Sequence, residues 1–278
     1  MANKVQIQHW IDDYGEDSDF VRVRVRGEFP RAATLQLISE EIVERAQAAF
    51  VRRHGGNVAK ALADGPGGLK QYVLDENRWA PRVLIVDVAR FGGDQSVIGM
   101  RQGKCFVVLK KYRELTIPQV AYHVHEWIEG EEPDHVIVDG VGLGAGVVDL
   151  LREMGHEVID ANARMTALEP RRFFNRRAEM WWRAKAWLEG GGMIPVDPEL
   201  KDDLTGPEYG FSDRGERVQI ESKEDMKARG LPSPDTADAL VMSFWQDFAP
   251  VEKLGEQTMA AKLAAATAAP DGLSWKSR

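Results

Sequence analysis

The chain has 278 residues, 44% of them hydrophobic, and a formal net charge of −8 at pH 7. This length fits one large domain or two small ones of ordinary globular composition, and the acidic balance argues against a protein that coats nucleic acid by bulk charge. The sequence has no run of roughly 18 uncharged apolar residues, no signal-peptide pattern and one cysteine, Cys105, which excludes an internal disulfide and a cysteine-cluster zinc site. We therefore expect a soluble, intracellular protein that does not cross a membrane and whose basic surfaces are local.

A strand is predicted near the N-terminus. Residues 20–26 alternate apolar and basic side chains, which places Phe20 and three arginines on one face of a strand and three valines on the other. Three arginines on one face could contact phosphates. A solvated strand edge that protects against aggregation explains the same pattern and is the favoured interpretation.

The next predicted element is a helix that begins after Ser39, the expected N-cap. Its apolar stripe consists of Ile42, Val43, Ala46 and Phe50. The glycine pair at residues 55–56 ends the helix, and the glycine-rich residues 65–68 punctuate the chain. We expect a domain boundary near residue 80.

Residues 82–87 form an almost continuous apolar run, which predicts a strand buried on both faces of a sheet. The run ends in Asp87, and a buried carboxylate is costly unless a partner neutralises it. A divalent cation at the end of the strand is one such partner. A structural cap on the turn at residues 91–94 is the other interpretation, and this strand alone does not decide between them.

Two further strands are predicted at residues 96–101 and 105–112, separated by a turn at residues 102–103. Short connections of this kind join antiparallel neighbours, so the first three strands should form an antiparallel meander. Cys105 lies in the third strand, where we expect a buried thiol.

A helix is predicted at residues 118–128, and it carries His123 and His125. Residues two apart cannot share a helix face, so we expect surface or packing roles for this pair rather than metal binding. The next strand, residues 135–139, is again apolar and again ends in an aspartate, Asp139.

Glycines follow this strand, and a helix and a further strand are predicted at residues 147–154 and 157–160. The segment Gly140–Ala145 fits the permissive G-x-G-x-x-A dinucleotide fingerprint, with Asp160 twenty residues after its first glycine. A dinucleotide-binding module that uses Gly140–Gly146 is therefore an alternative hypothesis. It is weakened by the antiparallel meander before the βαβ unit, and by Asp139, which would place a negative charge beside the pyrophosphate.

Residues 171–188 predict a long amphipathic helix. Its apolar stripe, interpreted as core, consists of Phe173, Phe174, Met180, Trp181, Ala184, Trp187 and Leu188. Arg172, Arg176 and Arg183 fall on another face, where contacts to DNA phosphates and plain solvation explain them equally well. Residues 207–211 and 217–222 then predict a β-hairpin with its turn at residues 213–215.

The last predicted helix begins after Ser233 and a proline, and it carries two carboxylates. Asp235 and Asp238 are three residues apart, so both lie on one face of the first turn. Alone they would be acidic decoration that complements the helix dipole. Together with Asp87 and Asp139 they make a cluster of hard oxygen ligands, which suits Mg²⁺ or Mn²⁺ rather than zinc.

Three acidic segments, residues 86–94, 136–142 and 233–240, resemble in order the three acidic motifs of the nuclease domain of phage large terminase subunits. The resemblance covers residues 81 to about 248. It implies the RNase H-like fold shared with RuvC-type resolvases: an α/β protein with a mixed central sheet, in which an antiparallel three-strand meander is followed by parallel strands and flanked by helices.

Residues 14–30 also resemble the segment that follows the packaging ATPase in this family. The sequence contains no G-x-x-x-x-G-K-[ST] loop, and Gly65–Lys70 lacks its spacing. We therefore expect a nuclease without its motor. Residues 1–80 would be a linker or accessory segment, residues 81–248 the RNase H-like nuclease domain, and residues 249–278 a flexible tail.

The resemblance implies a metal-dependent DNA endonuclease that cuts concatemeric double-stranded DNA by two-metal-ion hydrolysis. Two Mg²⁺ or Mn²⁺ ions about 3.5–4 Å apart would activate water and stabilise the leaving oxygen. Asp87 is expected to bridge both ions, with Asp139 binding one and Asp238 the other. Asp235 would be either a fourth ligand or a group that supports the ligands.

Lys223 and Lys227 precede the third motif and would either stabilise charge at the scissile phosphate or belong to a solvated helix face. The resemblance further implies partners: double-stranded DNA, the terminase ATPase domain, the small terminase subunit and the portal protein. The expected location is the cytoplasm of a phage-carrying bacterium. Within the enzyme class, a Holliday-junction resolvase is the alternative.

Overall fold

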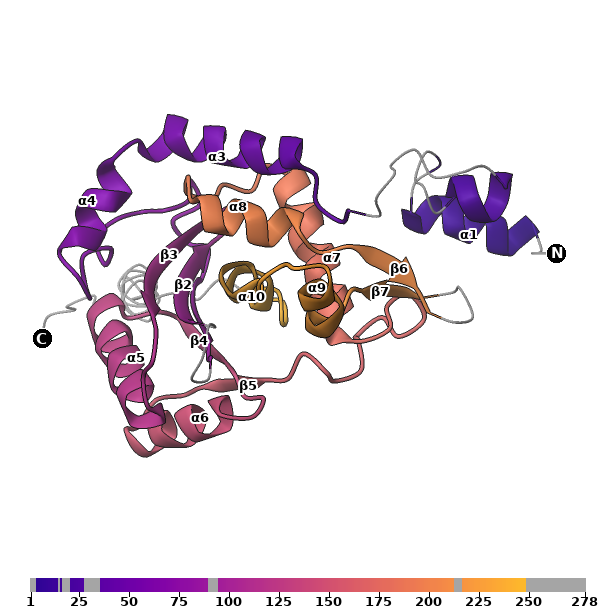
Figure 1. The fold of residues 1–278 in the computed structure, drawn as a ribbon. Coiled ribbons are helices and arrows are strands. Elements are labelled where there is room, and N and C mark those ends of the chain that lie inside the picture. Colours follow the sequence, from indigo (N-terminus) through magenta and orange to yellow (C-terminus); the bar gives the residue numbers. More distant parts are fainter. Residues whose placement is uncertain are drawn as a thin grey trace, which may run out of the picture.

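The computed structural model describes residues 4–14, 16, 21–27, 36–89, 95–212 and 217–248. At its centre lies a five-stranded sheet with helices on both faces (Figure 1). In spatial order the strands are β3 (Cys105–Tyr112), β2 (Ser96–Gln102), β1 (Arg82–Asp87), β4 (His135–Asp139) and β5 (Ile159–Ala161). Within the described ranges, no helix is long and apolar enough to span a bilayer.

The sheet combines antiparallel and parallel pairs, as predicted. β1, β2 and β3 form the antiparallel meander, whereas β4 runs parallel to β1, and β5 runs parallel to β4. Parallel strands need crossover connections, and helices α5 (Ile117–Glu131) and α6 (Gly144–Glu153) precede β4 and β5. The predicted fold class, an α/β protein with a mixed central sheet flanked by helices, is confirmed.

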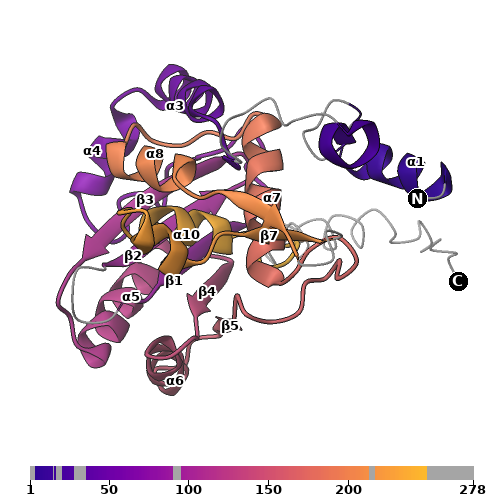
Figure 2. The same cartoon turned by 45° about the vertical axis from the view of Figure 1, so that its right-hand side comes forward.

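A hydrophobic core lies on each face of the sheet, because successive strand side chains point to opposite faces. In β1, Val83 and Ile85 enter one core, and Leu84 and Val86 enter the other. α5 and α6 cover the second core, and a separate set of helices covers the first (Figures 1 and 2). This set consists of α7 (Arg176–Glu189), α8 (Pro198–Thr205) and α10 (Asp235–Met242).

The remaining described elements lie before and after the sheet in the chain. They are α1 (Lys4–Tyr14), the π-helical turn η1 (Arg22–Arg26), α3 (Glu40–His54), α4 (Asn57–Ala63), α9 (Lys223–Ala228), β6 (Tyr209–Phe211) and β7 (Val218–Ile220). β6 and β7 pair antiparallel, which confirms the predicted hairpin. Its turn at residues 213–215 lies outside the described residues, as do the predicted turn at 91–94 and the tail at 249–278.

The strand predicted at residues 20–26 is wrong. Arg22–Arg26 form a π-helical turn that ends at Gly27, whose φ of 68° is left-handed. Alternation of apolar and polar residues favours a strand only where a neighbour completes the hydrogen-bond ladder, and among the described residues no strand pairs with this segment. The backbone groups therefore bond locally, and the arginines do not line one face of a strand.

The helix predicted at residues 171–188 begins late. Asn175 has an extended backbone and its side chain accepts a hydrogen bond from the Ala178 N–H, so α7 starts at Arg176. Before it, Phe173 forms a bridge with Val218 of β7 and is buried, whereas Phe174 is exposed. The apolar residues predicted to form one helical stripe therefore lie in two different structures. Phe173 precedes the helix and pairs with β7, and the later residues lie in α7.

Residues before the predicted boundary at residue 80 pack into both cores. Leu37 and Val43 join the first core, and Leu69 and Leu74 join the second. The predicted apolar stripe of the first long helix is confirmed, with three of its four residues buried in α3. The division of the chain into domains stays a prediction, and a cut at residue 80 would separate side chains that share these cores.

A buried ion pair fastens this N-terminal region to the sheet. The Glu131 carboxylate on α5 is fully buried, and it pairs with the guanidinium of Arg82 at 3.0 Å. The same carboxylate accepts the backbone N–H groups of Gly67 and Leu69 at 2.9 and 3.1 Å. One side chain thus satisfies three donors from the loop and the first strand.

Truncating this carboxylate should therefore be expensive. We expect Glu131→Ala to lower the free energy of unfolding by about 3–5 kcal/mol, because a buried guanidinium and two N–H groups lose their acceptor. Lys70→Ala is the matched control, since it removes an exposed ion pair with Glu132 and should cost less than about 1 kcal/mol. Urea denaturation followed by tryptophan fluorescence measures both. Equal losses in the two variants would contradict this assignment.

Candidate active site

A cavity of about 340 Å³ lies at the carboxyl ends of β1 and β4. Asp87 ends β1 and Asp139 ends β4, and both line it. Asp238 of α10 and Lys223 of α9 reach the same cavity. Further polar lining residues are Arg164, Asn175, Arg177, Gln219, Ser222 and Glu224. Three of the four predicted acidic residues therefore line one cavity.

The pairing register explains why the two strand-end aspartates meet. Val86 pairs with Val138 in the parallel strands β1 and β4, so the residues that follow, Asp87 and Asp139, end the two strands beside each other. The Val141 N–H donates to the Asp139 carboxylate over 3.1 Å, which fixes that side chain in a local turn.

Lys223 is the main positive group among these carboxylates. Its ammonium lies 2.8 Å from a carboxylate oxygen of Asp238 and 3.8 Å from one of Asp235. Burial opposes the charged amine, yet Asp238 and Asp87 together hold the pKa of Lys223 above its usual value. The lysine is therefore charged at neutral pH, and it compensates part of the negative charge of the cluster.

Asp87 is the carboxylate of the cluster whose negative charge is least compensated. The residue is 5% exposed, and burial raises its pKa well above the usual range, while Asp238, Asp235 and Asp139 add repulsion that Lys223 only partly offsets. Burial likewise raises the pKa of Asp139. Both strand-end carboxylates are therefore harder to ionise than a free aspartate, and a nearby cation would offset this cost.

The pKa of Asp238 shifts in the opposite direction because two cationic side chains lie beside its carboxylate. Burial alone would raise its pKa, but Lys223 and Arg177 hold the pKa of Asp238 below its usual value. The Trp181 indole N–H also donates to its carboxylate over 3.2 Å. The aspartate on α10 therefore ionises more readily than Asp87 on β1.

Asp235 does not line the cavity. It is 6% exposed, and its carboxylate accepts the Gln95 N–H over 3.0 Å while its other oxygen faces Lys223. This geometry favours the supporting role among the two roles predicted for Asp235. It holds the lysine and the start of β2 in place behind Asp238.

Asp203 and Arg177 were missed by sequence reasoning. The Asp203 carboxylate of α8 accepts the N–H groups of Thr236 and Ala237 at 2.9 and 3.3 Å, and so caps α10, whose preceding Pro234 offers no side-chain cap. Burial raises the pKa of Asp203 to about 7. Asp203 lies 33 residues before Thr236, so no local motif indicates this contact.

Arg177 lies on the first turn of α7. One guanidinium nitrogen donates to the Glu221 carbonyl over 2.6 Å. The other is 3.9 Å from the Asp238 carboxylate, and it is buried without a hydrogen bond. The sequence prediction named the neighbouring Arg176 as a possible phosphate contact and did not name Arg177, because helical spacing alone does not show which residues face the cavity.

The predicted DNA-contacting arginines do not line the cavity. Arg176 is 8% exposed, bonds the Glu179 carboxylate at 3.1 Å and stacks over Trp245, so it is part of the protein interior. Arg183 bonds the Phe244 carbonyl at 3.1 Å. Arg172 is half-buried over Phe173 and Trp182. Lys227 is exposed on α9. DNA contacts by these residues stay predictions, and the burial of Arg176 argues against one.

The glycines of the dinucleotide-like segment are explained by packing within the chain. A side chain at Gly140 would overlap the Asp160 carboxylate, and one at Gly144 would overlap the Asp139 carbonyl. Asp160, which would bind a ribose in a dinucleotide site, thus contacts this turn itself. The mixed sheet also lacks the all-parallel start of a dinucleotide-binding fold, so the structure does not favour that alternative.

The donor set suits a hard divalent cation. The carboxylates of Asp87, Asp139, Asp238 and Glu224 line the cavity together with no imidazole or thiol, and oxygen ligands of this kind are typical of Mg²⁺ or Mn²⁺. The raised pKa values of Asp87 and Asp139 are consistent with a site that binds a positive group. In this structure the cluster is held together through Lys223. Its carboxylates are not among the described ligand groups whose atoms all lie within 4.8 Å of one another.

Comparisons with known proteins point in one direction. No protein-family model matches the chain. It is 24% identical over 248 residues to the probable terminase large subunit of Enterobacteria phage P7, an alignment that covers 86% of this chain and 47% of that relative. The chain thus spans about half the length of the curated relative that it matches.

Solved structures show the fold. The nuclease domain of the large terminase subunit gp2 of bacterial virus Sf6 superposes with a TM-score of 0.56 at 20% identity, over 77% of this chain and all of that domain. A variant of that domain with manganese and beta-thujaplicinol gives 0.59 at 18% identity over the same shares. One with calcium gives 0.57 at 19%, over 74% and 97%. The chain has the RNase H-like fold of these nuclease domains, and the predicted resemblance is confirmed.

The raised pKa of Asp87 predicts how the stability of the folded chain depends on pH. A carboxyl group whose pKa is higher in the folded state favours folding when protonated, and this contribution is lost as the pH rises through the folded-state pKa. Asparagine mimics the protonated form. We therefore expect metal-free Asp87→Asn to be more stable than the native chain at pH 8 by about 1 kcal/mol or more, or roughly 2–4 °C in Tm.

The difference should shrink toward zero as the pH approaches the unfolded-state value of about 3.9. Thermal melts in EDTA between pH 4 and pH 8 measure this, and Asp203 titrates in both proteins, so it cancels. Asp149→Asn, an exposed change on α6, is the control and should leave the pH profile unchanged. A variant less stable than the native chain at pH 8 would refute the assigned charge imbalance.

Proposed function

We propose that the chain is the nuclease part of a viral genome-packaging terminase, and that it cuts concatemeric double-stranded DNA by metal-dependent hydrolysis. One observation carries the proposal: Asp87, Asp139 and Asp238, from separate parts of the chain, line one cavity at the end of an RNase H-like sheet. Buried carboxylates with too few positive partners are costly in a fold that does not use them. A cationic ligand accounts for their retention.

Asp87, Asp139 and Asp238 would hold two Mg²⁺ or Mn²⁺ ions, with Asp87 shared between them. When bound, such ions lower the pKa of water and stabilise the leaving oxygen of a phosphodiester. The similar Sf6 domain, solved with manganese and with calcium, supports a divalent ion here. Asp235 would keep its supporting role, because its carboxylate already bonds the Gln95 N–H.

The residues of the chain itself would bind and orient the DNA backbone. Lys223 carries a stable positive charge at the cavity, and the second guanidinium nitrogen of Arg177 is buried there without a hydrogen bond. Charge-assisted contacts from these two groups to a phosphate oxygen would place the scissile bond beside Asp87. Asp238, ionised and bonded to Trp181, would stay fixed while the phosphate binds.

The terminase relative also suggests partners and a cellular setting. We propose that residues 81–248 act as the nuclease domain, together with the packed residues from about 36 onward. The terminase ATPase domain, the small terminase subunit and the portal protein are the proposed partners, and the cytoplasm of an infected bacterium is the proposed location.

Plasmid cleavage tests the activity. We expect purified chain with Mn²⁺ or Mg²⁺ to nick and linearise supercoiled plasmid, EDTA to abolish this, and Asp87→Ala to lower the rate at least 10³-fold while the fold stays intact. Asp149→Asn should retain the native rate. Gel electrophoresis measures cleavage, and circular dichroism checks the fold. Metal-dependent nicking by Asp87→Ala at the native rate would refute the assignment.

The resolvase alternative is separated by substrate. A Holliday-junction resolvase would cut a four-way junction in preference to linear duplex of the same sequence. We expect the chain to cut both at similar rates. A strong preference for junctions would overturn the terminase assignment and leave the metal-dependent chemistry in place.

A further inference from the structure

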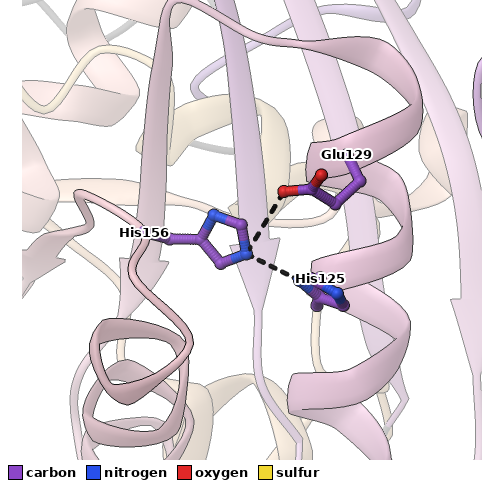
Figure 3. A group of neighbouring side chains, drawn as sticks. All are labelled: His125, Glu129 and His156. Atoms are coloured by element: carbon purple, nitrogen blue, oxygen red, sulfur yellow. Dashed lines mark hydrogen bonds and ion pairs between the residues drawn. The ribbon is translucent and has the colours of Figure 1, made fainter.

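A second group of ligand-type side chains lies away from the acidic cavity. His125 and Glu129 project from the same side of α5, one turn apart, and His156 faces them from the connection after α6 (Figure 3). His125 Nδ1 is 2.7 Å from His156 Nε2, and that nitrogen is 3.9 Å from a Glu129 carboxylate oxygen. Among the described residues, this is the group of three possible ligands whose atoms all lie within 4.8 Å of one another.

His123 and His125, which the sequence prediction considered as a pair, do not share partners, and the metal role that it disfavoured is reopened here for His125 alone. His123 points elsewhere: it bonds Glu126 at 2.9 Å and stacks on Tyr112 with ring centroids 4.6 Å apart. The partner of His125 is instead His156, 31 residues later, which only the packing of α6 beside α5 brings near. No spacing in the sequence indicates this contact.

The short contact between the two imidazoles requires a specific arrangement of protons. Two imidazole nitrogens at 2.7 Å need one proton between them, so one ring must donate while the other accepts. The His156 side chain is 10% exposed and is held in this position, whereas the Glu129 side chain is 65% exposed and can swing inward. A cation between the three groups would replace the shared proton and accept a lone pair from each.

We propose that His125, Glu129 and His156 form a binding site for a transition-metal ion of the zinc class, separate from the acidic cavity. Zinc binds imidazole nitrogen at about 2.0–2.1 Å, so two nitrogens on a tetrahedral ion lie roughly 3.4 Å apart. The observed separations of 2.7 and 3.9 Å lie on either side of that value. Small side-chain rotations therefore build two nitrogen ligands and one oxygen ligand, with the fourth position left to solvent.

The ligand chemistry distinguishes the two sites. Imidazole ligands favour Zn²⁺, Co²⁺ or Ni²⁺, whereas an all-carboxylate cluster suits Mg²⁺ or Mn²⁺. The site would tie α5 to the connection between α6 and β5, and β5 is the edge strand next to β4. Its expected role is therefore structural: an ion bound here stabilises the packing of two helices on the sheet.

The test is Zn²⁺ binding by chain without a histidine tag, in excess Mg²⁺ so that the acidic cavity is occupied. Isothermal titration calorimetry should give one Zn²⁺ per chain. His125→Gln should weaken that affinity at least tenfold, and Glu129→Gln at least threefold. His123→Gln, on the same helix but outside the group, is the matched control and should bind as the native chain does.

Cobalt provides an independent measurement. Co²⁺ should give visible absorption bands of a tetrahedral nitrogen site, and these should be lost in His125→Gln and kept in His123→Gln. Glu129 is exposed, so Glu129→Gln should fold even if His125→Gln does not. The proposal would be overturned if the native chain bound no Zn²⁺ in the presence of excess Mg²⁺. It would also be overturned if Glu129→Gln and His125→Gln bound Zn²⁺ as tightly as the native chain, or if His123→Gln weakened binding as much as they do.

Discussion

Repulsion among carboxylates at one edge of the sheet is the constraint on which this site depends. Asp87 is buried beside Asp139 and Asp238, and a single ammonium, that of Lys223, offsets part of the charge. Because Lys223 and Arg177 both favour Asp238, that residue ionises easily, while burial and its neighbours make Asp87 a poor anion. The fold thus holds more negative than positive charge in the cluster, and a bound cation is the simplest group to balance it.

Contacts elsewhere in the fold hold these carboxylates in place. The parallel register of β1 and β4 sets Asp87 and Asp139 side by side, and the close approach of Asp160 to Gly140 tightens the turn that follows β4. Asp203 caps α10 from another helix, which fixes the turn that carries Asp238. Each of these contacts joins segments that are distant in the sequence, so the geometry of the site depends on the whole core.

The elements predicted well are those with a strong local pattern whose partners in the sheet or core are also present. The apolar runs of β1 and β4, the meander and α5 each have a strong period or a clear turn, and they form as expected. The alternating residues 20–26 and the start of the helix at residue 171 failed for a common reason. Periodicity states which face would be apolar, but a neighbour decides whether the backbone is strand, helix or turn.

By itself, the sequence determined that aspartates end two buried strands and open a late helix, because residue order and apolar pattern are local properties. Only the tertiary structure decided which groups meet there: Arg177 rather than Arg176 at the cavity, Asp235 behind it, and His156 rather than His123 beside His125. Spacing along the chain fixes the face of one element. The packing of many apolar side chains sets how elements face each other, and it therefore selects the polar partners.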